Sequence, residues 1–509
     1  MQKFLLTLIL PALLALATTT YSTPVQDSLE MAKNLRKQGR IKEAYSLLKK
    51  YSHAHPEDLN ATWLFAQTAF WAGHVTTSDN TYRKAVRSNP GNYYLALDYA
   101  KILTDIGKFR EAAGIASNYL KYDPGSVDAS LLLGKIGYYR SDYTHARQYL
   151  EKVLEKESWN DDARKLLGDI CIAKAPKMLI NGGFATDDQP MVTYTPSAEF
   201  HIFLHALSNL GFTLSVPVFQ HISLSREAYW FSAANTSVFP DAHMEVTIGA
   251  GLLKIPSKNS LNATGNLGIS KRFIRHLDLS IQVDHNPYFY TLSSIDTSVM
   301  QSHAALSLAW VESKTWTGRL TIEGSNYSWD KNKAYGFNFW GFAPPLKLSV
   351  LSFRIGYGFN FSTSKDNHFT SEKSLTEILT NYDSTAAVKG VYNPYFTPKD
   401  QQIHSLLASV DIRPSKSIVA GISGSYGIYA TASIPYLYLD RDASLQPFVN
   451  RDFARDTFHP VEASAFLSAR LSENINLKVE YKYHKTYFYT SHYAGFGLSI
   501  SLCNERKRK

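Results

Sequence analysis

The residues best suited to bind a ligand are rings and charged groups in two stretches of the C-terminal half. The first stretch, 363–401, contains Tyr395 and Phe396. The second, 433–457, places charged residues beside Tyr436, Tyr438 and Phe448; they are Asp440, Arg441, Asp442, Arg451, Asp452, Arg455 and Asp456. Rings can cover the apolar faces of sugars while carboxylates and arginines bond sugar hydroxyls. The same residues would equally suit loops that are salt-bridged to themselves and fold inward as a constriction.

The sequence lacks the motifs of the common covalent chemistries. It contains no HExxH, no GxSxG, no P-loop and no GxGxxG after a strand. The histidines are scattered, and His53 and His55 are expected at a helix end rather than around a metal. We therefore predict no catalytic residue, no cofactor and no metal site, and a protein that is not an enzyme.

Composition excludes several classes of protein. The 509 residues include 53 lysines and arginines against 44 acidic residues, and only 2 cysteines. Two cysteines exclude a disulfide scaffold, and the absence of any long apolar run excludes a helical membrane protein. A membrane β-barrel stays allowed because its strands alternate. Lys3 and the tail 504–509 account for four of the nine net positive charges, and no patch has the pattern of an RNA-stacking surface, so no nucleic-acid partner is expected.

The N-terminus has the pattern of an export signal. Lys3 precedes an apolar run over 4–17, which ends in the small residues Ala15-Leu16-Ala17. This order is typical of a secretory signal peptide with its cleavage site. We predict that residues 1–17 are removed and that the mature protein begins near Thr18.

A repeat of 34 residues runs through residues 25–158. Its marks are glycine, proline and a small residue at fixed offsets, at Gly39, Gly73 and Gly107, at Pro56, Pro90 and Pro124, and at Ala44, Ala112 and Ala146. The fourth unit is degenerate, with Ser141 and Ser158 in place of glycine and proline. Period and order resemble the tetratricopeptide repeat, a helix-turn-helix unit. Residues 159–175 are then expected to form a capping helix and a linker.

The first helix of each such unit lines a concave groove. One stripe of these helices carries Lys33, Gln67, Lys101 and Lys135, with Trp63 and Tyr138 nearby. Lysines and rings on one face could hold an acidic peptide or glycan of the periplasm. The alternative is a solvated lysine face with rings that pack between helices.

From 176 to 503 the apolar period changes to two. Ile475, Leu477 and Val479, for example, alternate with Asn476 and Lys478. We count about sixteen such strands, with fourteen or eighteen left open. The short connections all follow even strands and the two long ones follow odd strands, as in an outer-membrane barrel with short periplasmic turns. We predict an α-helical solenoid followed by an antiparallel transmembrane β-barrel.

Cys171 and Cys503 flank this predicted barrel. The first precedes strand one, and the second follows strand sixteen, which pairs with strand one on closure. They could form a disulfide in an oxidising compartment, or be two unrelated thiols. The chain continues past the last strand, whereas outer-membrane barrels usually end on an aromatic residue.

Signal peptide, tetratricopeptide repeats and barrel, in this order, resemble the outer-membrane subunits of bacterial exopolysaccharide exporters. The resemblance implies outer-membrane lipid, a periplasmic protein at the groove and a polysaccharide chain as partners. The barrel would pass the chain outward without covalent chemistry. Two alternatives are a receptor or assembly scaffold with a plugged barrel, and a soluble or peripheral β-protein.

Overall fold

The structure is a computed structural model that describes residues 24–503, with gaps at 206, 259, 275, 312–314 and 381–387. The chain divides into two compact units, Met1–Leu166 and Leu167–Lys509. The predicted signal peptide (1–17) and basic tail (504–509) lie outside the described residues. In the described part of the chain, no helix is both long enough and apolar enough to cross a bilayer.

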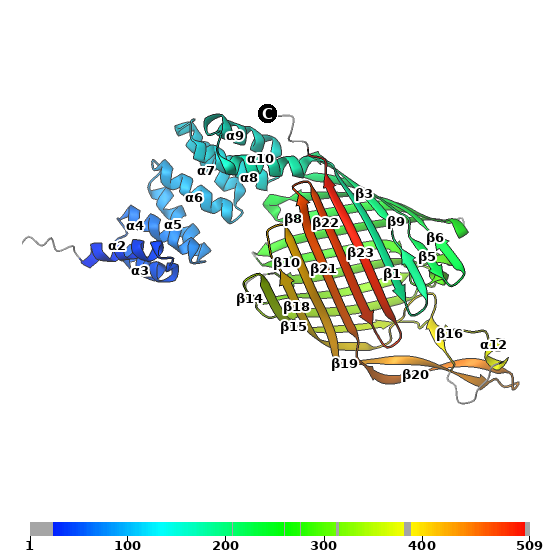
Figure 1. Ribbon diagram of the computed structural model, residues 1–509. Coiled ribbons are helices and arrows are strands. Elements are labelled where there is room, and N and C mark those ends of the chain that lie inside the picture. The colour runs from blue at the N-terminus through cyan, green and yellow to red at the C-terminus, as the bar shows by residue number, and fades with distance from the viewer. Residues whose placement is uncertain are drawn as a thin grey trace, which may run out of the picture. The chain divides into compact units, whose positions relative to one another are not determined.

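The N-terminal unit is built from antiparallel helix pairs (Figure 1). Its helices are α2 (Pro24–Lys37), α3 (Ile41–Ala54), α4 (Leu59–Trp71), α5 (Val75–Ser88), α6 (Tyr93–Asp105), α7 (Phe109–Tyr122), α8 (Val127–Tyr139) and α9 (Tyr143–Lys156), and α10 (Asp161–Lys174) runs into the second unit. The glycines of the turns, Gly39, Gly73 and Gly107, have φ of 75°, 87° and 82°. Glycine adopts this left-handed backbone without a steric penalty. Ser141 takes the same turn position in the fourth unit at φ 58°.

Helix packing in this unit follows the repeat. The small residues Ala44, Ser78, Ala112 and Ala146 are fully buried where paired helices approach. Pro56, Pro90 and Pro124 each stand two residues beyond the end of the second helix of a pair. Proline cannot donate the backbone hydrogen bond that would continue the helix, so it marks the helix end.

The second unit is a closed antiparallel barrel of sixteen strands. These are β1 (Lys177–Asp187), β3 (Ser197–His205), β4 (Ser208–Ser215), β7 (Tyr229–Phe239), β8 (Met244–Ile255), β9 (Ser260–Ile274), β10 (Leu277–Pro287), β11 (Met300–Trp310), β12 (Thr317–Tyr327), β13 (Lys333–Phe342), β15 (Leu351–Ser364), β18 (Gln401–Ile412), β19 (Ile418–Arg441), β21 (Val461–Ser472), β22 (Ile475–Lys485) and β23 (Thr490–Ser501). The barrel closes where β1 pairs with β23, from Lys177↔Ser501 to Asp187↔Ser491. Every described barrel strand therefore has a neighbour on both sides, and no edge remains open.

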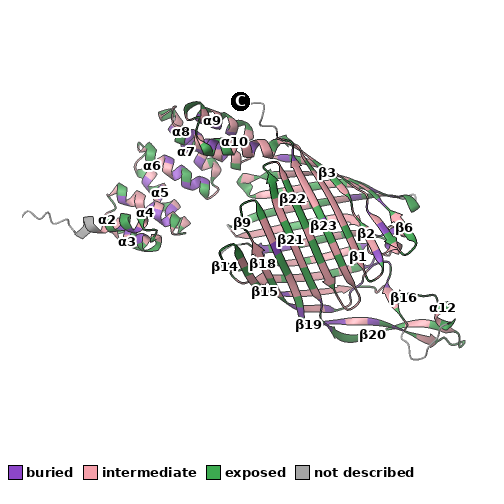
Figure 2. Cartoon of the chain, in the orientation of Figure 1, coloured by how far each residue is buried: buried purple, intermediate pink, exposed green. Residues whose placement is uncertain are grey.

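The outer face of the barrel is apolar. Ile281, Leu306 and Ile322 are registered neighbours on three successive strands, and all three are exposed. Exposed and less exposed residues alternate along the strands (Figure 2). An exposed apolar belt around a closed barrel is the arrangement found in outer-membrane barrels.

The connections at the two ends of the barrel differ. The seven joints after even strands are short, whereas the β15–β18 connection spans 365–400 and holds β16 (Phe369–Ser371), α12 (Leu375–Thr380) and β17 (Gly390–Tyr392). The predicted loop 433–457 is instead a ribbon in which β19 extends beyond the barrel and pairs with β20 (Pro447–Phe458) (Figure 1). The prediction of a loop was wrong there because β19, after it leaves the wall, forms a new antiparallel pair with β20.

Candidate functional site

The first element of the candidate site is the polar inner face of the barrel. Because side chains alternate across a strand, the residues between the exposed apolar ones point inward. Across β10, β11 and β12 these include Asp284, His303 and Glu323, and the His303 ring nitrogens lie 3.2 Å and 3.4 Å from the two carboxylates. Asn338 of β13 donates to Glu323 over 3.0 Å. The inner wall here is a continuous row of hydrogen-bonding groups.

The opposite part of the inner wall is also charged. On β22, Glu480 lies 2.8 Å from Lys478 and 3.1 Å from Lys482. His484 of the same strand lies 3.2 Å from Glu462 of β21. Acidic and basic groups therefore both face the interior, together with amides and hydroxyls, as in barrels that enclose water.

One mouth of the barrel is covered by a segment of the β15–β18 connection, residues 388–400, which we call the strap. Tyr395 of the strap has no exposed surface. Its ring stacks on Tyr327 at a centroid distance of 3.9 Å and meets Tyr288 edge-on at 6.0 Å, while its hydroxyl donates to Asp330 over 2.7 Å. The strap is thus anchored to the β10–β11 and β12–β13 connections.

The strap also contacts the β22–β23 connection. The hydroxyls of Tyr392 and Tyr487 are 3.0 Å apart, and Phe396 stacks on Phe488 at 4.3 Å. Burial raises the pKa of Tyr487 to about 12 and raises those of Tyr392 and Tyr395 further, so these phenols stay neutral at ordinary pH.

These contacts close the centre of the mouth. The β10–β11 connection joins the seventh and eighth barrel strands, and the β22–β23 connection joins the fifteenth and sixteenth. They therefore arise on opposite walls of a barrel that is roughly 30 Å across for sixteen strands. The ring centroids of Tyr290, in the β10–β11 connection, and Tyr489, in the β22–β23 connection, are nevertheless 6.1 Å apart. The strap lies against both connections. Aromatic side chains from opposite walls meet across the opening.

The structure divides the residues predicted for the two external stretches. Tyr395 is fully buried and presents no surface to a ligand in this structure, and Phe396 is half-buried against Phe488; their role as ligand contacts stays a prediction. The remaining predicted residues lie on the β19–β20 ribbon. They are Asp440, Arg441, Asp442, Arg451, Asp452, Arg455 and Asp456.

Arg451 belongs to the anchorage of the ribbon. Its guanidinium donates to the carbonyl oxygens of Asn367 and Phe369 over 2.7 Å and 3.1 Å. The Lys399 ammonium lies 3.7 Å from the centre of the Phe453 ring. One face of the ribbon is therefore bound to the strap and to the segment that precedes it.

In the helical unit, the predicted groove lysines are paired with acidic groups. Lys101 lies 3.0 Å from Asp128, Lys135 lies 3.2 Å from Asp162, and Lys33 lies 2.6 Å from Glu30. The structure thus presents a stripe of exposed ion pairs rather than free cations. Tyr138 packs against Tyr139 and Tyr143.

Two carboxylates that the sequence did not single out join successive repeats. Asp98 accepts hydrogen bonds from the Trp63 indole, from Gln67 and from the Tyr82 hydroxyl. These bonds hold Trp63 and Gln67 in place, so both residues support the packing between repeats. The available sequence signal was a carboxylate on the apolar helix α6 that follows a tyrosine of the preceding helix, Tyr82 of α5.

Asp79 is the second such carboxylate, and we expect Asp79→Asn to destabilise the solenoid by about 2 kcal/mol, the cost of losing charged hydrogen bonds. Asp79 accepts from Tyr99 and Lys108, both over 2.6 Å. Burial disfavours its ionised form, but these bonds and the lysine charge outweigh burial and lower its pKa. Hydrogen exchange of α5 to α7 in the full chain measures the effect.

The pH dependence of that difference has a defined sign. A lowered pKa contributes stability that is complete above the unfolded value of about 3.9 and is lost as pH falls through the folded value. Faster exchange in Asp79→Asn should therefore be clear at neutral pH and vanish in acid. Glu57→Gln, at an exposed carboxylate, is the control. A difference that persists in acid would contradict the assignment.

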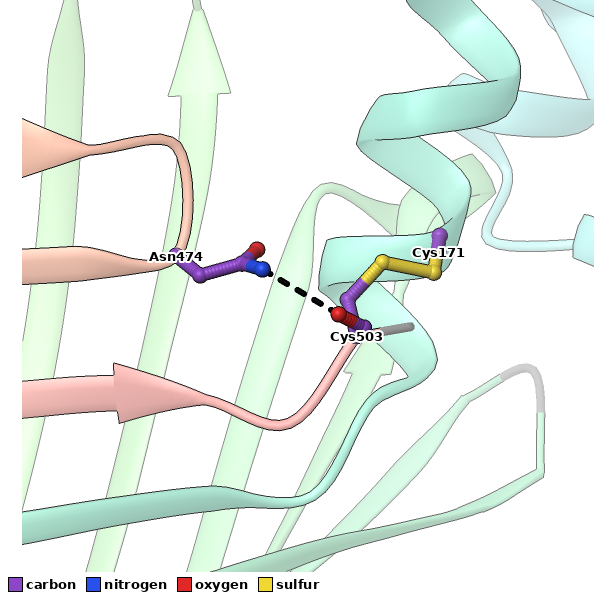
Figure 3. The surroundings of a disulfide bond; sticks show 3 residues. All are labelled: Cys171, Asn474 and Cys503. Carbon is purple, nitrogen blue, oxygen red and sulfur yellow. Dashed lines mark hydrogen bonds between the residues drawn. A yellow bond between two sulfur atoms is a disulfide. The ribbon is translucent and has the colours of Figure 1, made fainter. Parts of the chain in front are cut away.

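Cys171 of α10 and Cys503 beyond β23 form a disulfide, with Cα atoms 5.7 Å apart (Figure 3). Asn474, in the turn between β21 and β22, donates to the Cys503 carbonyl over 3.1 Å. In the part of the chain that the structure describes, no group of three histidine, cysteine, aspartate or glutamate side chains is placed to hold a metal ion.

Comparison with known proteins bears on the helical unit first. Residues 97–163 match a family model of the tetratricopeptide repeat. The N-terminal unit is a tetratricopeptide-repeat solenoid. Such solenoids offer extended concave surfaces for binding, and proteins are their usual ligands. No curated protein matches the sequence.

Several solved structures resemble parts of the chain. A bacterial polysaccharide outer membrane secretin is 8% identical, with a TM-score of 0.46 over 65% of this chain and 99% of its own. The tetratricopeptide solenoid resembles a repeat protein of Parabacteroides merdae (15% identity, TM-score 0.28, 31% of this chain and 63% of that one). It also resembles MamA of Desulfovibrio magneticus (14% identity, TM-score 0.28, 30% and 85%).

Proposed function

We propose that the protein exports a polysaccharide through the barrel across the bacterial outer membrane, and that the strap, which is closed in this structure, moves aside to let the chain pass. The observation that carries this proposal is a closed sixteen-strand barrel with an apolar outside and a hydrogen-bonding inside. A sugar chain is covered with hydroxyls, which need such partners once they leave bulk water. Barrels of this size are wide enough for an aqueous lumen.

The topology supports a direction of export. The first and last strands begin and end at the short-turn end of the barrel, where Ser501 N–H donates to Asn474 of the β21–β22 turn over 2.8 Å. Short turns of outer-membrane barrels face the periplasm. We infer that the solenoid lies in the periplasm and that the strap and ribbon face outward.

A deletion strain of the native host tests the proposal. Loss of released exopolysaccharide, with polymer retained in the periplasm, is the expected result, and expression of the intact protein should restore release. Unchanged polymer in both fractions would refute export. A receptor or scaffold with a plugged barrel would then be the better reading, since the buried aromatic strap supports a plug as well as a gate.

The solenoid is proposed to bind a periplasmic protein along the groove of Lys33, Trp63, Gln67, Lys101, Lys135 and Tyr138. Exposed ion pairs contribute little to folding, about 0.2 to 1 kcal/mol each, so their charges can be exchanged with those of a ligand. Lys101→Glu with Lys135→Glu is expected to abolish pull-down of the partner. Lys49→Glu with Lys84→Glu, on the second helices of their repeats, should leave it bound. Equal recovery by both variants would contradict the groove.

A further inference from the structure

The β19–β20 ribbon separates the charged residues of the 433–457 stretch onto two faces. Its pairing places Tyr436 opposite Asp452, Tyr438 opposite Asn450, and Asp440 opposite Phe448. Side chains of directly paired residues lie on the same face of a ribbon. Rings and carboxylates therefore share one face, which we call the ring face.

The other face carries the arginines and is partly covered. Arg451 pairs with Leu437, and Arg455 pairs with Ser433. Leu437 is only 5% exposed, and Val388 of the strap bridges to it. This face holds the ribbon against the strap, and Arg451 lies on it because its hydrogen bonds contribute to that attachment.

The ring face is buried at its barrel end, at Ala430, Ala432 and Phe458, but it is open farther out. Tyr436, Tyr438 and Phe448 are 46%, 37% and 38% exposed, and the centroids of the two tyrosine rings are 6.1 Å apart. Exposed aromatic rings do not stabilise the ribbon, because only burial of their apolar surface is favourable. A row of rings on a flat ribbon beyond the barrel wall is a surface available to a ligand.

The polar groups between the rings are fixed in position. Tyr436 donates to Asp452 over 3.2 Å, and Asn450 donates to Tyr438 over 2.9 Å and to Asp440 over 3.1 Å. Each carboxylate keeps further lone pairs that can accept from hydroxyls. The paired positions of this face, from Ala430 to Asp440 and from Phe448 to Phe458, include no lysine or arginine.

We propose that the ring face binds a polysaccharide without acidic groups as the chain leaves the barrel. The rings would cover the apolar faces of successive sugars, and the carboxylates and Asn450 would bond their hydroxyls. Asp440, Asp452 and Asp456 would repel polymers that contain uronic acids or sulfate. The inference rests on the proposed export function and adds to it the charge class of the exported chain.

Binding of soluble glycans to the purified full chain in detergent micelles tests the site. Cellohexaose serves as the neutral probe, alginate as the acidic one and chitosan hexamer as the amine-bearing one. We expect the neutral probe to bind and alginate to be excluded. Replacement of Tyr436, Tyr438 and Phe448 by alanine should weaken neutral binding by about tenfold or more, given the stabilisation expected from each ring contact.

Matched variants separate the contribution of the rings from those of the tyrosine hydroxyls and the carboxylate charges. Tyr436→Phe with Tyr438→Phe keeps the rings and should retain most of the affinity, whereas Asp440→Asn, Asp452→Asn and Asp456→Asn together should admit alginate. Arg455→Ala, on the opposite face, is the control. Neutral binding that survives loss of the rings would overturn the proposal, as would salt-sensitive binding of chitosan alone.

Failure of this inference can be told apart from failure of export. If the deletion strain retains polymer but the ring variants restore release and bind glycans as the wild type does, the ring face is wrong and export stands. If the deletion strain releases polymer normally, export fails whatever the binding data show.

Discussion

Tyr395→Ala is expected to raise the mean conductance of the purified protein in planar bilayers by about tenfold or more, because the closed strap loses its central anchor. Tyr395 is fully buried and contacts Tyr288, Tyr327 and Asp330 from other connections. Truncation of a buried aromatic ring costs about 3 kcal/mol or more, which is roughly a hundredfold change in the ratio of closed to open mouths.

Two variants control this measurement. Tyr395→Phe keeps the stacking and loses only the hydrogen bond to Asp330, so it should shift the balance by about 1 kcal/mol. Tyr335→Ala removes a ring that is 54% exposed on the outer face of β13, and should leave conductance unchanged. If wild type and Tyr395→Ala were equally closed, the strap would be a fixed plug, and the scaffold reading would gain support.

Local periodicity made much of the architecture predictable. A repeat of 34 residues reflects one helical pair, and a period of two reflects a pleated strand, so both units could be read from residue spacing. Even the degenerate fourth repeat keeps the turn, since Ser141 adopts the positive φ of its glycine counterparts. Sorting of turns by strand parity was predictable because short and long connections lie at opposite ends of an antiparallel barrel.

Loops that fold inward as a constriction were one of the two alternatives for the two external stretches, but the contacts of the strap were not predictable because they depend on barrel closure. Asn393-Pro394-Tyr395-Phe396 echoes Asn286-Pro287-Tyr288-Phe289 in the sequence, and the structure brings Tyr395 and Tyr288 together. No local pattern states that these segments meet, since their distance is set by strand number and by which walls carry them. The two faces of the ribbon required the β19–β20 register for the same reason.

The pairing of the groove lysines had a usable signal. Asp128 and Asp162 each stand 27 residues after Lys101 and Lys135. In a repeat of 34 residues, this offset places each carboxylate near the start of the first helix of the next unit, beside the lysine of the preceding one. A search for acidic residues 27 positions after each groove lysine would have found the ion pairs, whereas a search limited to the lysine positions of the first helices could not.

Loss of the Cys171–Cys503 disulfide is expected to lower the free energy of unfolding of the barrel by up to about 5 kcal/mol, the value that the chain-entropy account gives for a long loop. The barrel should then unfold at a lower urea concentration. The two cysteines are separated by 332 residues, and the loop between them contains every described barrel strand. The bond lies just beyond the Lys177↔Ser501 end of the β1–β23 seam, where Leu502 N–H also donates to the Pro176 carbonyl over 2.9 Å. The disulfide joins the two ends of the barrel sequence covalently. The start of β1 and the end of β23 therefore stay linked even if the hydrogen bonds of the seam break.

The measurement is the urea midpoint of the folded barrel, read from heat-modifiable gel mobility with and without dithiothreitol. The wild type should lose stability on reduction, whereas Cys171→Ser and Cys503→Ser should each match the reduced wild type and ignore the reductant. Serine keeps the size of the side chain, so equal behaviour of the two variants would separate the bond from local packing. Unequal midpoints, or thiols that react with maleimide in the unreduced protein, would contradict a closed ring and leave the seam dependent on its hydrogen bonds alone.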